Sequence, residues 1–306
     1  MMVKHPKVSI IMNCYNGEKF LHEALESVIS QSFEDWEVIF WDNDSTDRTA
    51  DIVESFDSKK IQYYKSESNT SLGLARNEAV KKATGKYIAF LDCDDMYLPG
   101  KLAQQIKLMD EKGFKLTYGS ALIIDEFGKV VRKYKVKNKS GYLLGKLLKS
   151  YEINMQTVMI ERALLNDNNL TFDPALKYSP DYNLFMQVAA ITECGVLNDY
   201  LVKYRVGLAG SLSKKTLHLV ADESQVTLDT ISIEHPKVTE KYKTAFEKAY
   251  IKLDYYRAIS LININKYEDA KELLWPVVCI SPKYALLYTL VLIKAPNSLI
   301  LRLLRR

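Results

Sequence analysis

Histidine and cysteine, the usual nitrogen and sulfur ligands of protein-bound metals, are scarce in this chain of 306 residues, which has four of each. The cysteines lie far apart and form no CxxC pair, and no HxxxH or HExxH motif occurs. These absences exclude the common zinc spacings and a disulfide framework, so we expect a reducing, cytoplasmic compartment. The short polar N-terminus is not expected to act as a signal peptide.

Glycine-rich phosphate loops are also missing. Neither G-x-G-x-x-G nor G-x-x-x-x-G-K-[ST] occurs, which disfavours an ordinary dinucleotide site and a P-loop. The net charge of +4 is too small to suggest nucleic acid as a partner. The apolar run at residues 284–293 has ten residues, whereas about 20 are needed to span a bilayer, so no transmembrane helix is expected.

The N-terminal part of the chain contains alternating strand-like and helix-like segments. Short β-branched apolar runs are separated by stretches whose apolar residues recur at helical spacing. Strands are predicted at residues 7–12, 36–41, 61–64 and 86–91, and helices at residues 18–31, 46–56 and 72–83. This alternation predicts a largely parallel α/β sheet with helices on both faces, which would bind ligands at the carboxyl ends of its strands.

The pattern changes after residue 105. Residues 106–215 contain shorter strands and more turns, which predict a mixed or antiparallel half of the sheet, and residues 180–191 a helix. Residues 216–306 are almost entirely helical in pattern, with a helical hairpin at 250–279. We therefore expect a domain at residues 1–215, whose ligand-binding half ends near residue 105, followed by a C-terminal helical region at 216–306.

Three carboxylates, those of Asp92, Asp94 and Asp95, crowd into four residues directly after the last predicted parallel strand. Their repulsion must be offset by a cation or by hydrogen-bond donors. Without histidine partners, the set suits Mg²⁺ or Mn²⁺, which take one or two carboxylates together with phosphate oxygens and water. The implied ligand is a diphosphate. The plainer alternative is a solvated turn ahead of Pro99.

A second polar cluster, DNDS at residues 42–45, follows the predicted strand at 36–41. It half-resembles a calcium loop, but it lacks the glycine of that loop and has Val53 in place of the bidentate glutamate. We expect Asp44 or Ser45 to cap the helix that follows. That arrangement would leave Asp42, at the strand end, free for a ligand.

Taken in order, these segments resemble the family 2 glycosyltransferases of the GT-A fold, inverting enzymes of the type that builds bacterial surface polysaccharides. The likeness rests on VSIIMNCYNG in the first strand, DNDSTD where the family has DDGSTD, ARN at residues 75–77, and YIAFLDCDDMYLPGKL around a DxD motif. It is strong over residues 7–105, weaker over 106–215 and negligible beyond. It implies a GT-A catalytic domain at 1–215, in which residues 106–215 bind the acceptor.

The resemblance also implies roles for single residues at the nucleoside end of the donor. Tyr15 would pack on the nucleobase, and the Asp42 carboxylate would bind the base edge. Arg76 would lie near the base or the phosphates. The family usually has proline where Asn13 stands, so the match is not complete here.

At the diphosphate end, the resemblance assigns the acidic cluster that follows the fourth strand. Asp92 would meet the ribose, and Asp94 would coordinate Mg²⁺ or Mn²⁺ on the diphosphate. Asp95 would support the metal ligand from behind. These assignments make Asp94 the single expected protein ligand of the metal.

The catalytic base is expected at the start of a late helix, where the family carries an acidic pair. Here Pro180 replaces the first acid and Asp181 fits the second, so Asp181 is the candidate base. In the alternative, Pro180 takes the first helical position and Asp181 only favours the helix dipole. Asp173 and Glu152 would then be the next candidates.

The implied activity is sugar transfer, with inversion, from a nucleotide-diphosphate sugar to a hydroxyl of a glycan or lipid-linked glycan acceptor. Surface polysaccharide, lipooligosaccharide or lipid-linked glycan assembly is the expected setting. Departures at Asn13, Pro180 and Gly207, where a histidine commonly follows the YR of residues 204–205, keep a binding module without transferase activity open. A nucleotidyltransferase, which also uses carboxylates and Mg²⁺, is the other alternative.

Residues 127–151 contain eight Lys or Arg and no acidic residue. This stretch predicts attraction to anionic lipid head groups or to a polyprenyl-diphosphate acceptor, unless it is simply a solvated hairpin. The C-terminal helices are expected either to lie on the cytoplasmic face of the inner membrane, or to pack on the catalytic domain or on a second copy of the chain in a homodimer.

Overall fold

The computed structural model describes residues 5–208, 217–296 and 300. The chain divides into two compact units, Met1–Ser211 and Leu212–Arg306. This division and the boundary expected after residue 215 both fall in the stretch 209–216, which lies outside the described part of the chain. Each unit is described separately below.

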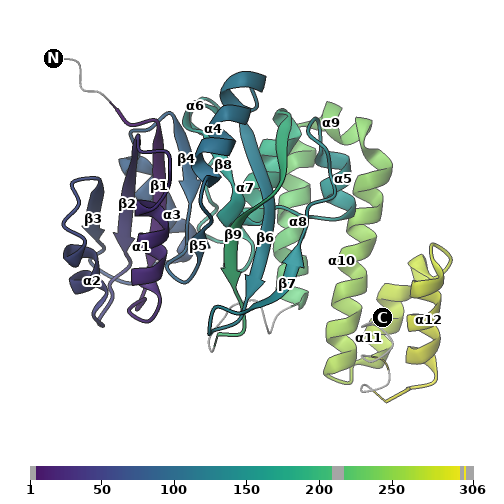
Figure 1. Cartoon of the computed structure of the whole chain (residues 1–306). Coiled ribbons are helices and arrows are strands. Elements are labelled where there is room, and N and C mark those ends of the chain that lie inside the picture. The colour runs from purple at the N-terminus through teal and green to yellow at the C-terminus, as the bar shows by residue number, and fades with distance from the viewer. Residues whose placement is uncertain (1–4, 209–216, 297–299, 301–306) are drawn as a thin grey trace. The chain divides into compact units, whose positions relative to one another are not determined.

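Four parallel strands form the first half of the sheet in the first unit (Figure 1). In spatial order β3-β2-β1-β4, they are β3 (Ile61–Lys65), β2 (Trp36–Asp42), β1 (Val8–Cys14) and β4 (Tyr87–Phe90). Every residue of β1 and β4 is buried, as expected for central strands covered on both faces. The predicted parallel α/β sheet is confirmed.

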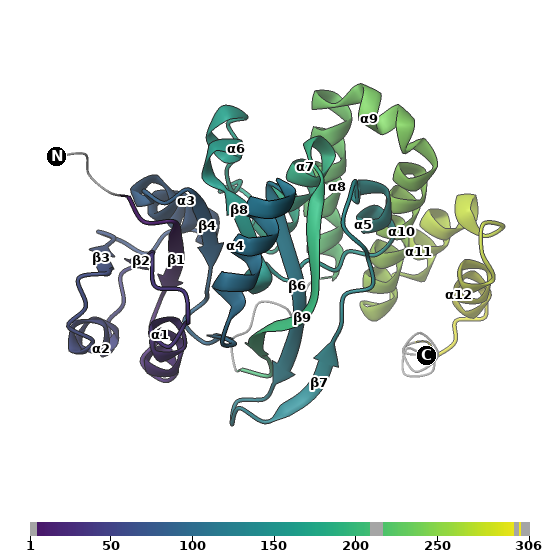
Figure 2. The same cartoon turned by 45° about the horizontal axis from the view of Figure 1, so that its top comes forward.

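The faces on which the connecting helices lie show where the sheet has its ligand-binding crevice. Figure 2 shows α1 (Leu21–Ile29) and α2 (Thr49–Ser55) on one face and α3 (Leu72–Lys82) on the other. The chain changes face because β4 returns to pair with β1, on the side opposite to β2. The strand order therefore reverses between β1 and β4, which is where open α/β sheets bind ligands.

The second half of the sheet is mixed, as predicted, and continues in the order β4-β8-β6-β9-β5. Its strands are β8 (Met159–Glu161), β6 (Leu116–Ile124), β9 (Cys194–Arg205), the unpredicted two-residue β5 (Met96–Tyr97), and β7 (Val130–Tyr134), which pairs with β6. The pairs are antiparallel except for β6 with β9. The β5–β9 pair places the end of β9 beside the acidic cluster that follows β4.

The remaining helices of the first unit surround this mixed half. They are α4 (Lys101–Lys112), α5 (Leu144–Lys149), α6 (Arg162–Asp167), α7 (Pro180–Ile191) and the 3₁₀ turn η1 (Met155–Thr157). The predicted helix at 180–191 is confirmed, with Pro180 in its first turn, where the missing N–H costs no helical hydrogen bond. α7 is buried along most of its length.

The second unit is helical, as the sequence predicts. It contains α8 (Leu217–Glu234), α9 (Pro236–Lys241), α10 (Lys243–Asn263), α11 (Tyr267–Leu274), the 3₁₀ turn η3 (Trp275–Val277) and α12 (Pro282–Leu292). α10 and α11 form the expected hairpin and share an apolar core with α12. Over the ranges that the structure describes, every helix is too short or too polar to cross a bilayer.

Candidate active site

Two loops at the carboxyl ends of β1 and β2 are bound to each other. The Asn16 N–H donates to Ser45 Oγ at 2.9 Å, and Asn16 Oδ1 accepts from the Thr46 N–H at 2.9 Å. The Gly17 N–H donates to Thr49 Oγ1 at 3.0 Å. Because these bonds join residues 29 to 32 positions apart in sequence, the two loops form one edge of the crevice between β1 and β4.

Tyr15 and Asp42, the two residues expected to hold a nucleobase, differ sharply in exposure. The Tyr15 side chain is 54% exposed at the end of β1, so its ring is available to a ligand. Asp42 is fully buried: Oδ2 accepts from the Tyr63 hydroxyl at 2.6 Å, and Oδ1 from the Ser45 N–H at 2.7 Å. Asp42 is therefore not an unengaged side chain, because each of its oxygens already accepts one hydrogen bond from the protein, and its expected contact with a nucleobase stays a prediction.

The predicted cap of α2 is wrong. The side chain that accepts from the first turn is that of Asp47, whose Oδ1 bonds the Thr49 N–H at 3.0 Å, not that of Asp44 or Ser45. Ser45 is engaged instead by the loop after β1. Asp44 has φ of 71°, the left-handed region that aspartate tolerates, at the position where the DDGSTD pattern has glycine.

Asp92 is bound on both of its carboxylate oxygens and on its backbone. Arg76 Nη2 donates to Oδ1 at 3.1 Å, and Gln156 Nε2 donates to Oδ2 at 2.6 Å. The Asp92 N–H in turn donates to Gln156 Oε1 at 2.9 Å. Arg76 is nearly buried, with its guanidinium 5.5 Å from the Phe172 ring, whereas Asp92 keeps 32% of its side chain exposed. The ion pair therefore presents Asp92, and not Arg76, to the crevice.

Asp94 is the acidic side chain of the cluster for which the described residues supply no side-chain donor. Its carboxylate accepts from its own backbone N–H, but no side chain within the described ranges forms a hydrogen bond or ion pair with it. Burial, reinforced by the negative charge of Asp92, raises the pKa of Asp94 to about 6, although Arg205 opposes this shift. A partly buried carboxylate in this state needs a cation, so Asp94 fits the single protein ligand of a hard divalent ion.

A closed metal site of three or more His, Cys, Asp or Glu side chains does not occur within the described ranges. This agrees with the ligand habit of Mg²⁺ and Mn²⁺, which take most of their oxygens from water and phosphate. The residues present therefore fit a cation that arrives with a diphosphate. They do not fit a cation held by the protein alone.

Asp95 is buried, and it is bound from β9. Its Oδ1 accepts from the Arg205 N–H at 2.7 Å. Burial and the neighbouring carboxylates raise the pKa of Asp95 well above its usual value. Asp95 thus ties the acidic loop to the end of β9, and its support of a metal ligand at Asp94 stays a prediction.

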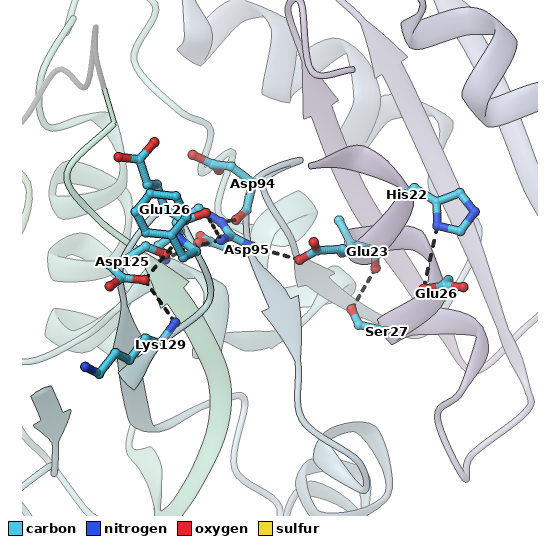
Figure 3. A network of polar contacts seen from close by, with 12 residues as sticks. His22, Glu23, Glu26, Ser27, Asp94, Asp95, Asp125, Glu126 and Lys129 are labelled. Carbon is cyan, nitrogen blue, oxygen red and sulfur yellow. Dashed lines mark hydrogen bonds and ion pairs between the residues drawn. The ribbon is translucent and has the colours of Figure 1, made fainter. Parts of the chain in front are cut away.

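The Arg205 guanidinium connects three segments of the first unit. Nε donates to the Asp94 carbonyl at 2.9 Å, Nη1 to the carbonyls of Asp125 and Glu126 at 3.2 and 3.0 Å, and Nη2 to Glu23 Oε2 at 2.9 Å. Figure 3 shows Asp94, Asp95, Asp125, Glu126 and Glu23 gathered in this network. One buried cation therefore fixes the acidic loop against α1 and the β6–β7 turn.

Asp181 reaches the same edge of the sheet from the start of α7. Burial raises its pKa, the positive charge of Arg76 opposes the shift, and the negative charge of Asp92 adds to it. The Tyr204 hydroxyl also has a raised pKa, through burial and the charges of the carboxylates at 95, 92, 94 and 181. Asp181 therefore lies within electrostatic reach of the acidic cluster, although it is almost ninety residues away in sequence.

Glu152, one of the fallback bases, serves the fold. Its Oε1 accepts from the Tyr118 hydroxyl and the Asn138 N–H, both at 3.0 Å, and Oε2 from the Lys137 N–H at 3.0 Å. Asp173, the other fallback, accepts from the Ala175 N–H in a local turn. Both oxygens of Glu152 are therefore engaged by the fold, whereas Asp173 and Asp181 each accept from a backbone N–H close in sequence.

Sequence reasoning missed Gln156. It lies in η1, in the part of the chain where the family likeness is weak, and no charged or repeated pattern marks it. Arg205 did carry a signal, the YR that ends the late strand, but its four partners come from three distant segments.

Comparisons with known proteins identify the family of this chain. The family model described as "Glycosyl transferase family 2" matches residues 9–164. The Escherichia coli protein "UDP-Glc:alpha-D-GlcNAc-diphosphoundecaprenol beta-1,3-glucosyltransferase WfgD" is 33% identical over 210 residues, which cover 68% of this chain and 80% of that protein.

Solved structures show the same fold. The Staphylococcus aureus TarS fragment 1–349, in complex with UDP, is 28% identical with a TM-score of 0.55, over 71% of this chain and 65% of that one. The Pyrobaculum calidifontis mannosyltransferase PcManGT, in complex with GDP-Man and Mn²⁺, has a TM-score of 0.61 over 94% of this chain and 84% of that one, at 15% identity. The expected GT-A fold is confirmed, and the chain belongs to glycosyl transferase family 2.

Proposed function

We propose that this chain transfers a sugar, with inversion, from a nucleoside-diphosphate sugar to an acceptor hydroxyl. The observation that carries the proposal is the arrangement of Asp94 and Asp181 at one sheet edge. Asp94 is a carboxylate in need of a cation, and Asp181 is a partly buried carboxylate of raised pKa. Burial raises the pKa of both carboxylates, and they come from different elements, Asp94 from the loop after β4 and Asp181 from the start of α7, so one can hold the metal while the other takes the proton.

The donor would lie along the edge formed by the ends of β1, β2 and β4. The exposed Tyr15 ring supports stacking of a base, and the fixed Asp92 carboxylate supports a hydrogen bond to a ribose hydroxyl. Asp94 would hold the divalent ion on the diphosphate. When bound, that ion neutralises the charge that the leaving diphosphate gains as the glycosidic bond breaks.

Asp181 would take the proton of the acceptor hydroxyl. Its raised pKa makes it a stronger base than an ordinary aspartate, and proton transfer from an alcohol must then be late and concerted with attack. One base acting opposite the leaving group supports a single displacement, and therefore inversion.

The substrates proposed for this chain follow those named for its relatives. WfgD is named for UDP-Glc and a GlcNAc-diphosphoundecaprenol acceptor, and TarS was solved with UDP. We propose a UDP-sugar donor and a lipid-linked diphosphate acceptor, used at the cytoplasmic face of the membrane. Surface polysaccharide assembly would be the setting of this reaction.

The test is a transfer assay with purified chain, Mn²⁺, radiolabelled UDP-sugars and a synthetic GlcNAc-diphospho-lipid. Sugar should appear in the lipid product, EDTA should abolish transfer, and added Mn²⁺ should restore it. The anomeric configuration of the product should be opposite to that of the donor. In a parallel reaction with UTP and a sugar 1-phosphate, release of pyrophosphate and formation of a UDP-sugar would indicate a nucleotidyltransferase. Metal-dependent UDP binding without turnover on any donor would indicate a binding module.

A further inference from the structure

The basic segment, residues 127–149, carries positive charges that no acidic side chain among the described residues neutralises. Its eight cations are Lys129, Arg132, Lys133, Lys135, Lys137, Lys139, Lys146 and Lys149, and no acidic residue lies among them. All eight are exposed. None forms an ion pair or a side-chain hydrogen bond with another residue in the part of the chain that the structure describes. Elsewhere in the first unit, Lys7, Lys19, Lys81 and Lys86 are paired with acids.

The same segment exposes large apolar side chains. Phe127, at the tip of the β6–β7 turn, is 86% exposed, and Val131 is 55% exposed. A strand packed on a core buries one of its faces, yet Val130–Lys133 of β7 are exposed at four consecutive positions. Figure 2 shows β7 at the lower margin of the sheet, where it starts at the turn after β6. The segment therefore combines an exposed aromatic tip with a dense, unneutralised positive charge.

We propose that the basic segment is a docking surface for an anionic lipid bilayer. Phe127 and Val131 would enter the interface, and the cations would lie at the lipid phosphates. This combination is what interfacial binding needs, because one or two apolar side chains alone bind weakly and a polybasic patch supplies the second attraction. Charge complementarity favours a lipid surface over a protein strand, since a second copy of β7 would bring like charges together.

The docking surface is joined to the candidate active site by Arg205. Its Nη1 donates to the carbonyls of Asp125 and Glu126, which directly precede Phe127, while Nε donates to the Asp94 carbonyl. In Figure 3 the Lys129 side chain extends away from this network. If the proposed function holds, a bilayer bound at the hairpin brings the head group of a lipid-linked acceptor to the edge that carries Asp94.

Vesicle flotation of the full chain tests the surface without requiring turnover. The chain should float with phosphatidylcholine vesicles that contain 30% phosphatidylglycerol, should float poorly with pure phosphatidylcholine, and should be released by 0.5 M salt. Exchanging Lys133→Gln together with Lys135→Gln should lower the partition coefficient by about fivefold for each lysine removed. Phe127→Ala should lower it further, with no change in melting temperature, because these side chains are exposed.

The matched control is Lys107→Gln with Lys112→Gln, which removes the same charge from exposed positions on α4. An equal loss in the control and the hairpin variant would overturn the proposal, as would the absence of flotation with anionic vesicles. A dimer in sedimentation velocity that Phe127→Ala dissociates would assign β7 to a second copy instead. UDP titration of each variant keeps the proposed function separate, because docking can fail while nucleotide binding persists.

Discussion

Gln156 holds Asp92 at two points: its Nε2 donates to the Asp92 carboxylate at 2.6 Å, and its Oε1 accepts from the Asp92 N–H at 2.9 Å. The amide is buried, so these bonds are protected from competing water. Together with Arg76 on the other oxygen, they fix the carboxylate before any ligand arrives. A donor hydroxyl that binds Asp92 thus pays no cost for ordering it.

Gln156→Leu should weaken UDP binding and destabilise the fold at once. The change keeps most of the volume but leaves the Asp92 N–H and one carboxylate oxygen without their partner. We expect a loss of about 1–3 kcal/mol in the free energy of unfolding and a fall in UDP affinity. Gln104→Leu, on α4, is the control and should change neither quantity. Unchanged UDP affinity in Gln156→Leu would show that Asp92 does not contact the donor.

Arg76→Met should cost more stability in the wild-type background than in an Asp92→Asn background. The guanidinium is nearly buried, so removing it leaves a carboxylate that retains only the Gln156 bond. A double-mutant cycle by chemical denaturation should give a coupling energy of about 1–3 kcal/mol. A coupling energy near zero would mean that Arg76 acts through its packing on Phe172 and not through its charge.

Asp94 should make the free energy of unfolding of the metal-free protein depend on pH. Its pKa is raised to about 6, so between its unfolded value and pH 6 the folded state binds more protons than the unfolded state. Its contribution to stability is therefore present at low pH and is lost as the pH rises through 6. Asp94→Asn should raise the free energy of unfolding of metal-free protein by about 1–2 kcal/mol at pH 7.5 and should have little effect at pH 4.

Metal binding at Asp94 should have the opposite pH dependence and strengthen as the pH rises. Mn²⁺ needs the ionised carboxylate, so the Mn²⁺-dependent part of UDP affinity should fall as the pH drops below 6. Calorimetric titration of UDP with and without Mn²⁺, at pH 5 and pH 7.5, measures this difference. Asp94→Asn should bind UDP with the same affinity whether Mn²⁺ is present or not, and a retained Mn²⁺ effect would place the metal elsewhere.

Asp181→Asn should abolish transfer while keeping donor binding. Removal of a general base typically costs 10²–10⁴-fold in rate, and the amide still fits the first turn of α7. If Asp181 only favours the helix dipole, the same change should cost about 0.3–1 kcal/mol of stability and little activity. Turnover and melting temperature measured on one preparation separate these outcomes. Asp173→Asn is the control and should remain active.

Asp42→Ala should unfold or strongly destabilise the protein, contrary to what its position at a strand end suggests. The change leaves the partly buried Tyr63 hydroxyl and the Ser45 N–H without an acceptor. Tyr63→Phe removes one of these bonds alone and should cost about 1–3 kcal/mol. Denaturation curves for both variants test this. A folded Asp42→Ala variant with normal stability and lost UDP binding would restore Asp42 to the nucleobase.

The amino-acid pattern determines much of this protein without tertiary information. The spacing of apolar residues and the runs of β-branched residues determine which segments form strands and which form helices, because each element must bury one face or both. Strict alternation up to β4 then permits few topologies, since crossover connections have one hand. The carboxyl ends of parallel strands share an edge, so the cluster at residues 92–95 was correctly expected beside the loops after β1 and β2.

Tertiary structure alone decided which polar side chains face the crevice. Asp42 and Asp92 both follow a parallel strand, but Tyr63 on β3 covers the first, whereas Arg76 and Gln156 support the second and leave it partly exposed. These partners lie from 16 to 64 residues away. Local pattern shows which face of an element is apolar, but it does not encode which distant donor will meet a given carboxylate. Which donor meets the carboxylate depends on the order of the strands in the sheet and on how the loops cross the edge of the sheet.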